Sequence, residues 1–574
     1  MKELLARLLT RPAIFSEMIA ASLLANVLAL ATPLFVIQVL NRYVAHGVDA
    51  TLTTLAAGTV IAIALEFGFR QVRMRLAAFV NKSFDEGLTN SAFGVLTGAK
   101  TAALEALPPG LRQQIVSGAD SLQTAYAAPN VAALFDVPFA LVFVAVLFLL
   151  SPTLAVIVAV FLVLVFMIAL MTLSSLRNPT RDMVAAGGRR GALIGVASAA
   201  ADTLRAFNAQ GFIRRQWREE SALYQKLHRV VTGRQGLVQS LSVTAQGLMS
   251  VAVIATGAVL VVRGELDIGG MIGANILAAR ALGPIIKLAQ MSEAFAKARQ
   301  SLALLQEFSK VPQERTEGSA LDEFSGALEF QDLAFVYPGQ RAPLFESMSL
   351  KLEPGAFLIV AGSNGTGKTT LARLIVGLLE PIRGKILVDG VDLSQIVPEW
   401  WRKQIIYLPQ EPGFLNATIR ENMLAGNPDM DEETLNELVR TAGLKSFIDE
   451  SPDGFNTALT NNGANLSLGV RRRLALARAL ATDGMLVVID DLTEGLDAEG
   501  SQTVVNAMNK LSERGRTVIV FTHDPKIFTA APRYLDLNSK PVPRLVTKKA
   551  DTDADAETHP PPEPTPAPAK EAQS

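Results

Sequence analysis

The sequence predicts an α-helical membrane domain of six spans fused to an α/β domain with a phosphate-binding loop. Apolar stretches long enough to cross a bilayer recur through the first 310 residues. A complete loop of the form G-x-x-x-x-G-K-[ST] lies at residues 362–369. From Gly326 to about Leu545, strand-like and helix-like segments alternate, which is typical of an α/β domain.

Composition excludes several function classes. The net charge of −1 gives no reason to expect a nucleic-acid partner. The chain has no cysteine, which excludes disulfides, thiolate catalysis and zinc-thiolate sites. Hydrophobic residues make up 49% of the 574 residues, a high share for a soluble enzyme.

The membrane domain is predicted from six apolar stretches, at about 14–40, 51–70, 131–150, 152–174, 237–262 and 268–290. Several reach the ~20 residues that cross a ~30 Å hydrocarbon core, so buried helices of a large soluble protein are the weaker interpretation. The last two are rich in Gly, Ala, Ser and Gln, which indicates helices that line a cavity or pack closely. No signal peptide is expected, because the first apolar run is too long for one.

Basic residues set the expected orientation. The segment 175–236 contains eleven Lys or Arg and the segment 71–130 contains five, whereas 41–50 and 263–267 contain one each. The basic segments should be cytoplasmic, which places both ends of the membrane domain inside the cell. Their composition favours long helical extensions that bend near 107–110 and 208–211.

Four regions are expected along the chain: a membrane domain at 1–310, a polar linker at 311–325, a nucleotide-binding domain at 326–547 and a tail at 548–574. The tail is acidic and then contains six prolines between Pro560 and Pro568. Such a composition cannot bury a core, so the tail is expected to be a disordered, solubilising end.

The phosphate-binding loop lies between a strand-like run, 356–360, and a helix-like run, 369–376. In that setting, backbone N–H groups and a helix N-terminus close around phosphates. Lys368 would reach the β- and γ-phosphates of ATP, and the Thr369 hydroxyl would ligate Mg²⁺. The predicted nucleotide-binding residues here are Gly362, Ser363, Asn364, Gly365, Thr366, Gly367, Lys368, Thr369 and Thr370.

Further candidates lie at the ends of other strand-like runs. Asp490 ends the run 487–490, where phosphate-loop ATPases place an acid beside Mg²⁺, and Asp491 would orient the attacking water. Gln410 follows a strand at 405–406 and is a candidate ligand of Mg²⁺ and the water. His523 ends the run 518–523, where a γ-phosphate sensor is needed. Tyr337 is a candidate to stack on the adenine ring.

These parts together resemble an ATP-binding cassette (ABC) exporter of half-transporter layout. The decisive segment is 466–480, similar to the family's signature helix, L-S-G-G-Q-R-Q-R followed by an Ala-Leu-Ala-Arg-Ala run. The resemblance implies that Ser467 and Gly469 bind the γ-phosphate of ATP held by a second subunit. It also implies that Asp497 contacts the other subunit, and that two ATPs lie between two chains.

Within the family, the chain resembles type I secretion exporters of the protease/RTX branch, through residues 33–42 and 135–139. This likeness implies a multi-pass inner-membrane protein with a cytoplasmic nucleotide-binding domain. It implies export of an unfolded polypeptide, with a membrane-fusion adaptor and an outer-membrane channel as partners. An exporter of lipid, glycan or peptide, and an ATP-binding membrane scaffold with little hydrolysis, remain as alternatives.

Several positions depart from the family pattern. Asp491 stands where the family has Glu, and a displacement of about 1 Å costs on the order of a hundredfold in rate. Leu468 and Val470 replace a Gly and the Gln of the signature, and residues 460–463 replace G-E-x-G. In a heterodimer these changes would impair both ATP sites. A homodimer with slow hydrolysis is therefore favoured over a heterodimer.

Overall fold

The computed structural model describes residues 7–547 apart from positions 8, 45–46, 48, 492–495, 497, 525–526, 528–530 and 532. The chain divides into two compact units, Met1–Gln313 and Glu314–Ser574. The predicted tail at 548–574 lies outside the described residues.

The first unit is helical in its described part. Six of its helical segments are long and apolar enough to cross a membrane, namely Pro12–Val44, Asp49–Gly98, Ala128–Leu150, Pro152–Ala199, Gln210–Val262 and Ile268–Gln290. Each contains one predicted apolar stretch, so the prediction of six spans is confirmed. The elements are α2 (Pro12–Leu28), α3 (Ala31–Gln38), a π-helical segment (Val39–Val44), α4 (Asp49–Gly98), α5 (Thr101–Glu105), α6 (Pro109–Ala125), α7 (Ala128–Asp136), α8 (Ala140–Leu150), α9 (Pro152–Ser175), α10 (Arg177–Ala199), α11 (Ala201–Ala206), α12 (Gln210–Val262), α13 (Ile268–Gln290) and α14 (Ser292–Phe308).

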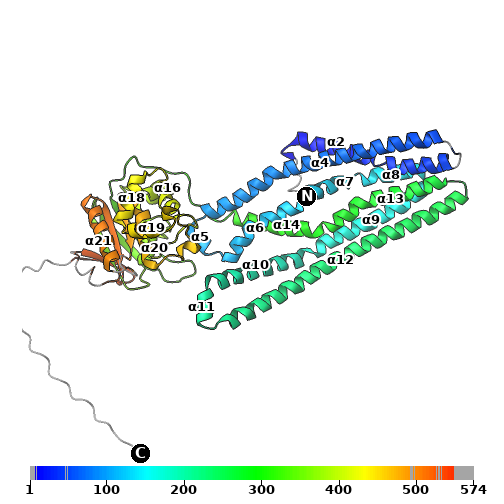
Figure 1. The fold of residues 1–574 in the computed structure, drawn as a ribbon. Helices are drawn as coiled ribbons and strands as arrows, with labels where there is room; N and C mark the ends of the chain where they lie inside the picture. The colour runs from blue at the N-terminus through cyan, green and yellow to red at the C-terminus, as the bar shows by residue number, and fades with distance from the viewer. Residues whose placement is uncertain are drawn as a thin grey trace, which may run out of the picture. The chain divides into compact units, whose positions relative to one another are not determined.

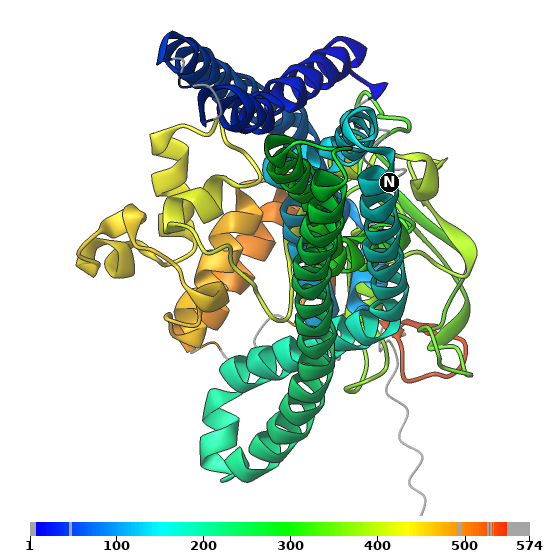
Figure 2. The ribbon, with the colours of Figure 1, turned by 90° about the vertical axis from the view of Figure 1, so that its right-hand side faces the viewer.

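Two helices extend far beyond a bilayer. At 1.5 Å per residue, the 50 residues of α4 and the 53 residues of α12 span about 75–80 Å, against a ~30 Å hydrocarbon core. The helices break at both predicted bends, between α5 and α6 and between α11 and α12. In Figure 1 these two breaks lie at the end of the unit opposite the turn that joins α12 to α13. Figure 2 shows α10, α11 and α12 as a hairpin that projects from the other helices of this unit.

The last span, α13, packs through small residues. A Cβ added to Gly273 would lie 2.3 Å from Ile37 Cγ1, and one added to Gly269 would lie 2.4 Å from Asn41 Oδ1. The glycines therefore let α13 approach the end of the first span closely. Pro284 lies inside α13. Because proline has no N–H, the carbonyl of Arg280 lacks its ordinary helical donor.

The second unit contains two sheets. The smaller has the strand order β2-β1-β4-β5 and the larger has the order β10-β9-β3-β8-β7-β6. In the larger sheet, β9, β3, β8, β7 and β6 are parallel neighbours. The strands are β1 (Leu328–Phe335), β2 (Phe345–Leu352), β3 (Phe357–Ala361), β4 (Arg383–Val388), β5 (Val391–Asp392), β6 (Ile405–Leu408), β7 (Leu486–Asp490), β8 (Thr517–Thr522), β9 (Arg533–Asp536) and β10 (Arg544–Thr547).

Burial explains the apolar runs of the central strands. Every residue of β7 and β8 is buried, as expected for parallel strands covered on both faces. Because parallel strands end at the same edge, the segments that follow β3, β6, β7 and β8 meet there. The helices are α15 (Lys368–Ile375), α16 (Pro398–Lys403), α17 (Ile419–Leu424), α18 (Glu432–Thr441), α19 (Lys445–Glu450), α20 (Leu468–Leu480) and α21 (Ala498–Glu513).

The segment predicted as a linker, 311–325, is exposed over most of its length, but two of its side chains are anchored on the second unit. Glu314 accepts two hydrogen bonds from Arg402, at 2.9 and 2.7 Å. Phe324 is buried and lies edge-on to Trp401, with ring centroids 5.2 Å apart. The polar composition therefore agrees with the exposure of most of the segment, and the two anchors, one acid and one aromatic ring, are what it did not indicate.

Trp401→Ala is expected to destabilise the second unit strongly. Trp401 is 0% exposed, and its indole N–H donates to the Ile375 carbonyl at 2.8 Å. Loss of the ring leaves a cavity and an unpaired carbonyl, at a cost of about 3–5 kcal/mol. Calorimetry of the purified protein in lipid should show the transition of this unit lowered by about 10 °C. The half-buried neighbour Trp400 is the matched control, and equal losses for Trp400→Ala and Trp401→Ala would contradict this assignment.

Candidate functional site

The phosphate-binding loop connects β3 to α15, as the motif requires. Gly367, at φ +108°, adopts the left-handed conformation just before α15, and a Cβ there would lie 2.6 Å from Leu344 Cδ2. Lys368 is 8% exposed, and its Nζ donates to the carbonyls of Gly362 at 2.7 Å and Ser363 at 3.1 Å. The ammonium group therefore folds back over the loop whose amides would hold phosphate.

The loop is also held by the segment that follows β9. Asn538 Oδ1 accepts from the Ser363 N–H at 2.9 Å, and Lys540 Nζ donates to the Thr366 carbonyl at 2.8 Å. Burial lowers the pKa of Lys540. Asn538 and Lys540 are 175 and 174 residues away in the sequence from the loop residues that they contact. The sequence reasoning missed them, because no motif marks their positions.

Tyr337 follows β1 and lies beside the helix that starts at the loop. Its hydroxyl is 2.9 Å from the Thr370 hydroxyl, and its ring meets Phe335 edge-on with centroids 4.9 Å apart. The contact with Thr370 brings an aromatic ring close to the phosphate-binding segment, as stacking on a nucleotide base requires.

Asp490, the last residue of β7, is a buried acid with unsatisfied oxygens. It is 1% exposed, and neither carboxylate oxygen has a hydrogen-bond partner among the described residues. Burial raises the pKa of Asp490, and the charge of Asp491 adds to the rise, while the Thr369 hydroxyl and Lys368 oppose it. Burial, with the charge of Asp490, also raises the pKa of Tyr407 to about 12, so that residue stays neutral.

The donor set around Asp490 fits a magnesium ion. The Thr369 hydroxyl donates to Gln410 Oε1 at 3.3 Å, which brings a hydroxyl and an amide oxygen together. Mg²⁺ prefers oxygen ligands, usually one or two carboxylates completed by phosphates and water. Asp490, Thr369 and Gln410 are therefore the residues that would hold it.

Asp491 and His523 form a hydrogen-bonded pair. His523 Nδ1 lies 2.8 Å from Asp491 Oδ2, and the second oxygen, Oδ1, is buried without a partner among the described residues. Asp491 is 3% exposed and has φ +65°, a left-handed conformation that Asp tolerates better than most residues. The pair leaves one Asp491 oxygen, Oδ2, hydrogen-bonded and the other, the buried Oδ1, unpaired beside Asp490.

The signature segment lies at the start of α20. The Ser467 hydroxyl caps this helix by accepting from the Val470 N–H at 3.3 Å, and a Cβ on Gly469 would meet nothing within 4 Å. Leu468 is 44% exposed. Over the described part of the chain, no hydrogen bond joins Ser467 or Gly469 to the phosphate-binding loop. Asp497 lies outside the described residues.

A link from α20 to Gln410, one of the predicted magnesium ligands, was not predicted. Arg472 Nη2 donates to the backbone carbonyl of Gln410 at 3.3 Å. Arg472 occupies the position of the second Gln in the motif L-S-G-G-Q-R-Q-R. The replacement of Gln by Arg at position 472 is visible in the sequence, but the sequence does not indicate which backbone group the guanidinium contacts.

Two family models match the chain. The ABC transporter transmembrane region matches residues 15–285, and the ABC transporter domain matches residues 345–494. The chain belongs to the ABC transporter family. It is therefore a multi-pass membrane protein whose second unit binds and hydrolyses ATP to drive transport, as the sequence predicted.

Curated relatives are exporters of bacterial toxins. The "Toxin RTX-I translocation ATP-binding protein" of Actinobacillus pleuropneumoniae is 28% identical over 516 residues, which cover 89% of this chain and 72% of that protein. The "Leukotoxin export ATP-binding protein LtxB" of Aggregatibacter actinomycetemcomitans matches with the same identity and coverage. The resemblance to type I secretion exporters is confirmed by these relatives.

A solved structure shares the fold. A bacterial Atm1-family ABC exporter with ATP bound superposes with a TM-score of 0.81 at 19% identity, over 92% of this chain and 94% of that chain. The predicted fold class, a six-helix exporter domain joined to an α/β nucleotide-binding domain, is confirmed.

ATP binding should depend on magnesium less strongly as the pH falls. An acid with a raised pKa keeps its proton to higher pH, and Mg²⁺ needs the deprotonated Asp490. The ratio of ATP affinities with and without Mg²⁺ should therefore fall as the pH is lowered toward the raised pKa of Asp490, and should begin to fall at a higher pH than for an ordinary aspartate. Asp490→Asn is the control, since ATP itself titrates equally in both proteins. The assignment is wrong if the two proteins give parallel pH profiles.

Two substitutions of Tyr337 should distinguish the contribution of its ring to ATP binding from that of its hydroxyl. Tyr337→Phe loses only the contact with Thr370 and should change the KM for ATP by less than about threefold. Tyr337→Ala also loses the stacking surface, worth about 1–3 kcal/mol, and should raise KM by about tenfold or more. Equal effects of Phe and Ala on steady-state KM would argue against a stacking role.

Proposed function

We propose that this chain is the ABC component of a type I protein secretion system, which moves an unfolded polypeptide out of the cytoplasm. The observation that carries the proposal is the pairing of a complete ATP site with similarity to toxin exporters over 89% of the chain. The relatives' substrates are polypeptides by their names, and this substrate class comes to the chain by that similarity.

The proposed reaction uses the residues at the edge of the larger sheet. Lys368 and the amides of the loop bind the phosphates, and Tyr337 stacks on adenine. Thr369, Gln410 and Asp490 would hold Mg²⁺, which would neutralise charge on the transferring phosphoryl group. Asp491 accepts a hydrogen bond from the attacking water through its unpaired oxygen, Oδ1, while His523 fixes the other oxygen and faces the γ-phosphate.

Slow hydrolysis follows from the short side chain of Asp491. One methylene fewer than Glu displaces the carboxylate from the water, and positioning errors of about 1 Å cost on the order of a hundredfold. The bond to His523 limits how far Asp491 can move to compensate. We therefore assign to this chain a working motor with low turnover.

A homodimer completes the site. Ser467 and Gly469 lie at the start of α20 without a hydrogen bond to their own phosphate loop in the described part of the chain, which suits a role toward a second subunit's ATP. The dimer lies in the inner membrane with its nucleotide-binding units in the cytoplasm. A membrane-fusion adaptor and an outer-membrane channel complete the export path.

A second candidate function is an ATP-binding scaffold with little hydrolysis. The exposed Leu468 favours it, because its bulk lies where the family's glycine lets backbone approach a phosphate. Export of lipid, glycan or peptide shares the same ATP site. Only substrate-dependent stimulation of ATP turnover separates that alternative from protein export.

ATP turnover by the purified protein in lipid tests the motor. Lys368→Ala should abolish turnover, because the phosphates lose their charged ligand. Asp491→Glu should raise turnover by roughly tenfold or more, since the longer acid reaches the water. Asp491→Asn, which cannot accept the proton, is the matched control and should be inactive. Turnover that survives Lys368→Ala, or ATP binding without turnover in both the unchanged protein and Asp491→Glu, would replace the motor with the scaffold.

A further inference from the structure

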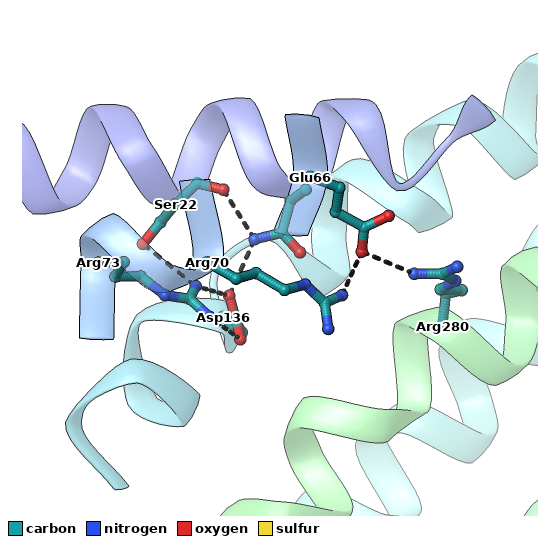
Figure 3. Close-up of polar contacts among 7 residues, drawn as sticks. Ser22, Glu66, Arg70, Arg73, Asp136 and Arg280 are labelled. Carbon is teal, nitrogen blue, oxygen red and sulfur yellow. Dashed lines mark hydrogen bonds and ion pairs between the residues drawn. The ribbon is translucent and has the colours of Figure 1, made fainter. Parts of the chain in front are cut away.

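Charged side chains meet inside the membrane-spanning helices of the first unit (Figure 3). Glu66 belongs to α4, within the apolar stretch 51–70, and Arg280 belongs to α13. Ionisable groups at such depth are costly, and they mark pathways for substrates or ions by default. The sequence reasoning passed over them, because each is a single charge in a long apolar run.

One carboxylate is shared by two guanidinium groups. Glu66 Oε1 lies 2.5 Å from Arg70 Nη2 and 3.4 Å from Arg280 Nη1. The Glu66 side chain is 9% exposed, whereas those of Arg70 and Arg280 are 51% and 30% exposed. A single negative charge thus faces two positive charges, and the excess positive charge lies on the exposed Arg70 and the half-buried Arg280.

A second cluster, one turn further along α4, contains equal numbers of acidic and basic groups. Arg73 pairs with Asp136 through both terminal nitrogens, and Asn26 Nδ2 donates to the same carboxylate at 2.9 Å. Arg73 also donates to the Ser22 hydroxyl at 3.3 Å. Figure 3 shows the two clusters side by side along α4. This pair joins the first three spans and has one acid for one base, so it needs no further anion.

Glu66 and Arg73 face the other helices of their own unit, and Arg70, on the same side of α4, is half exposed. Glu66, Arg70 and Arg73 follow the spacing i, i+4, i+7 and therefore share one face of α4. Large apolar side chains on the opposite face, among them Val60, Ile61 and Val72, are exposed in the isolated chain. Lipid or a second subunit would cover that opposite face, and the charged face lies toward α2 and α13.

We propose that Arg280 and Arg70 bind carboxylate groups of the transported polypeptide, with Glu66 as the resident counter-ion that the substrate displaces from Arg280. The inference rests on the proposed function, protein export, and adds a substrate-recognition site to it. A guanidinium group is always charged and matches a carboxylate with two parallel hydrogen bonds. Two guanidinium groups share the one resident carboxylate, so an incoming carboxylate would pair with Arg280 while Glu66 stays paired with Arg70, and no charge is left unpaired in a low-dielectric region.

Depth favours a peptide carboxylate over a lipid phosphate. Arg280 lies twelve residues after the first residue of α13, Ile268, which is about 18 Å along the helix. By the same measure from Asp49, Glu66 lies about 25 Å and Arg70 about 31 Å along α4, so Arg280 and Glu66 fall within a ~30 Å hydrocarbon core and Arg70 at its boundary. A lipid headgroup would have to leave the interface to reach Arg280, whereas an extended polypeptide that crosses the membrane passes this level.

The test measures the binding of two fluorescent peptides to the full-length protein in phosphatidylcholine nanodiscs, without nucleotide. The probes are fluorescent unstructured peptides, identical except that one carries Glu where the other carries Gln. Fluorescence anisotropy should give about tenfold tighter binding of the Glu peptide. Arg280→Gln and Arg70→Gln should each remove most of that preference and leave the affinity for the Gln peptide unchanged.

The direction in which Glu66→Gln changes the affinity for the Glu peptide decides between the proposal and a purely structural ion pair. Removal of the resident counter-ion should tighten binding of the Glu peptide by severalfold, the opposite of the effect of Arg280→Gln. A purely structural ion pair predicts that both changes weaken binding of both peptides, and that result would overturn the proposal. Arg280→Lys keeps the charge and should keep part of the preference. Exposed Arg263, after α12, is the matched control, and Arg263→Gln should change nothing.

Three further outcomes are informative. Equal binding of both peptides by the unchanged protein overturns the carboxylate site while polypeptide export stands. Binding of neither peptide, together with ATP turnover that Lys368→Ala abolishes, overturns both the site and protein export. Loss of the preference when phosphatidylglycerol is added to the nanodiscs assigns the arginines to a lipid phosphate, and also overturns the proposal.

Discussion

Two adjacent carboxylates buried at the end of one strand govern the nucleotide-binding unit. Asp490 and Asp491 are 1% and 3% exposed, and three of their four oxygens have no hydrogen-bond partner in the described part of the chain. Buried charge is costly unless it is paired or binds a metal. The surrounding elements offset this cost. The Thr369 hydroxyl at the start of α15 and the Gln410 amide after β6 lie near the acids, and His523 after β8 binds the one satisfied oxygen. The parallel order β3-β8-β7-β6 is what brings them to one edge.

The sequence predicted those parts of the molecule that depend on local pattern. Uninterrupted apolar runs are sufficient to identify spans, because a bilayer admits only helices or barrels. The ends of apolar strands identified Asp490, Gln410 and His523, because all these strands are parallel and end at one edge. The bond between Asp491 and His523 was not predicted, since it depends on side-chain placement across β7 and β8.

Contacts between distant segments were out of reach of such reasoning. Asn538 and Lys540 support the phosphate loop through its backbone, and a backbone contact leaves no pattern in the sequence. The segment from Glu314 to Phe324 resembled a linker because its anchors are few. Arg280 was overlooked for a related reason: a single arginine has meaning only beside Glu66, which is 214 residues away in the chain.

Pro284 gives the last span a mechanical property. The carbonyl of Arg280 has no helical donor, so bending α13 at this turn breaks no hydrogen bond and costs less than bending elsewhere. From Pro284 to the end of α14 at Phe308 is about 36 Å of helix, and a rotation of about 10° would move its far end by about 6 Å. Arg280 lies one helical turn before Pro284, and therefore close to the point about which the helix would bend. The Arg280 side chain would move little while the end of α14 is displaced. Binding of a carboxylate by Arg280, as proposed, and bending of the helix at Pro284 could therefore occur independently in this fold.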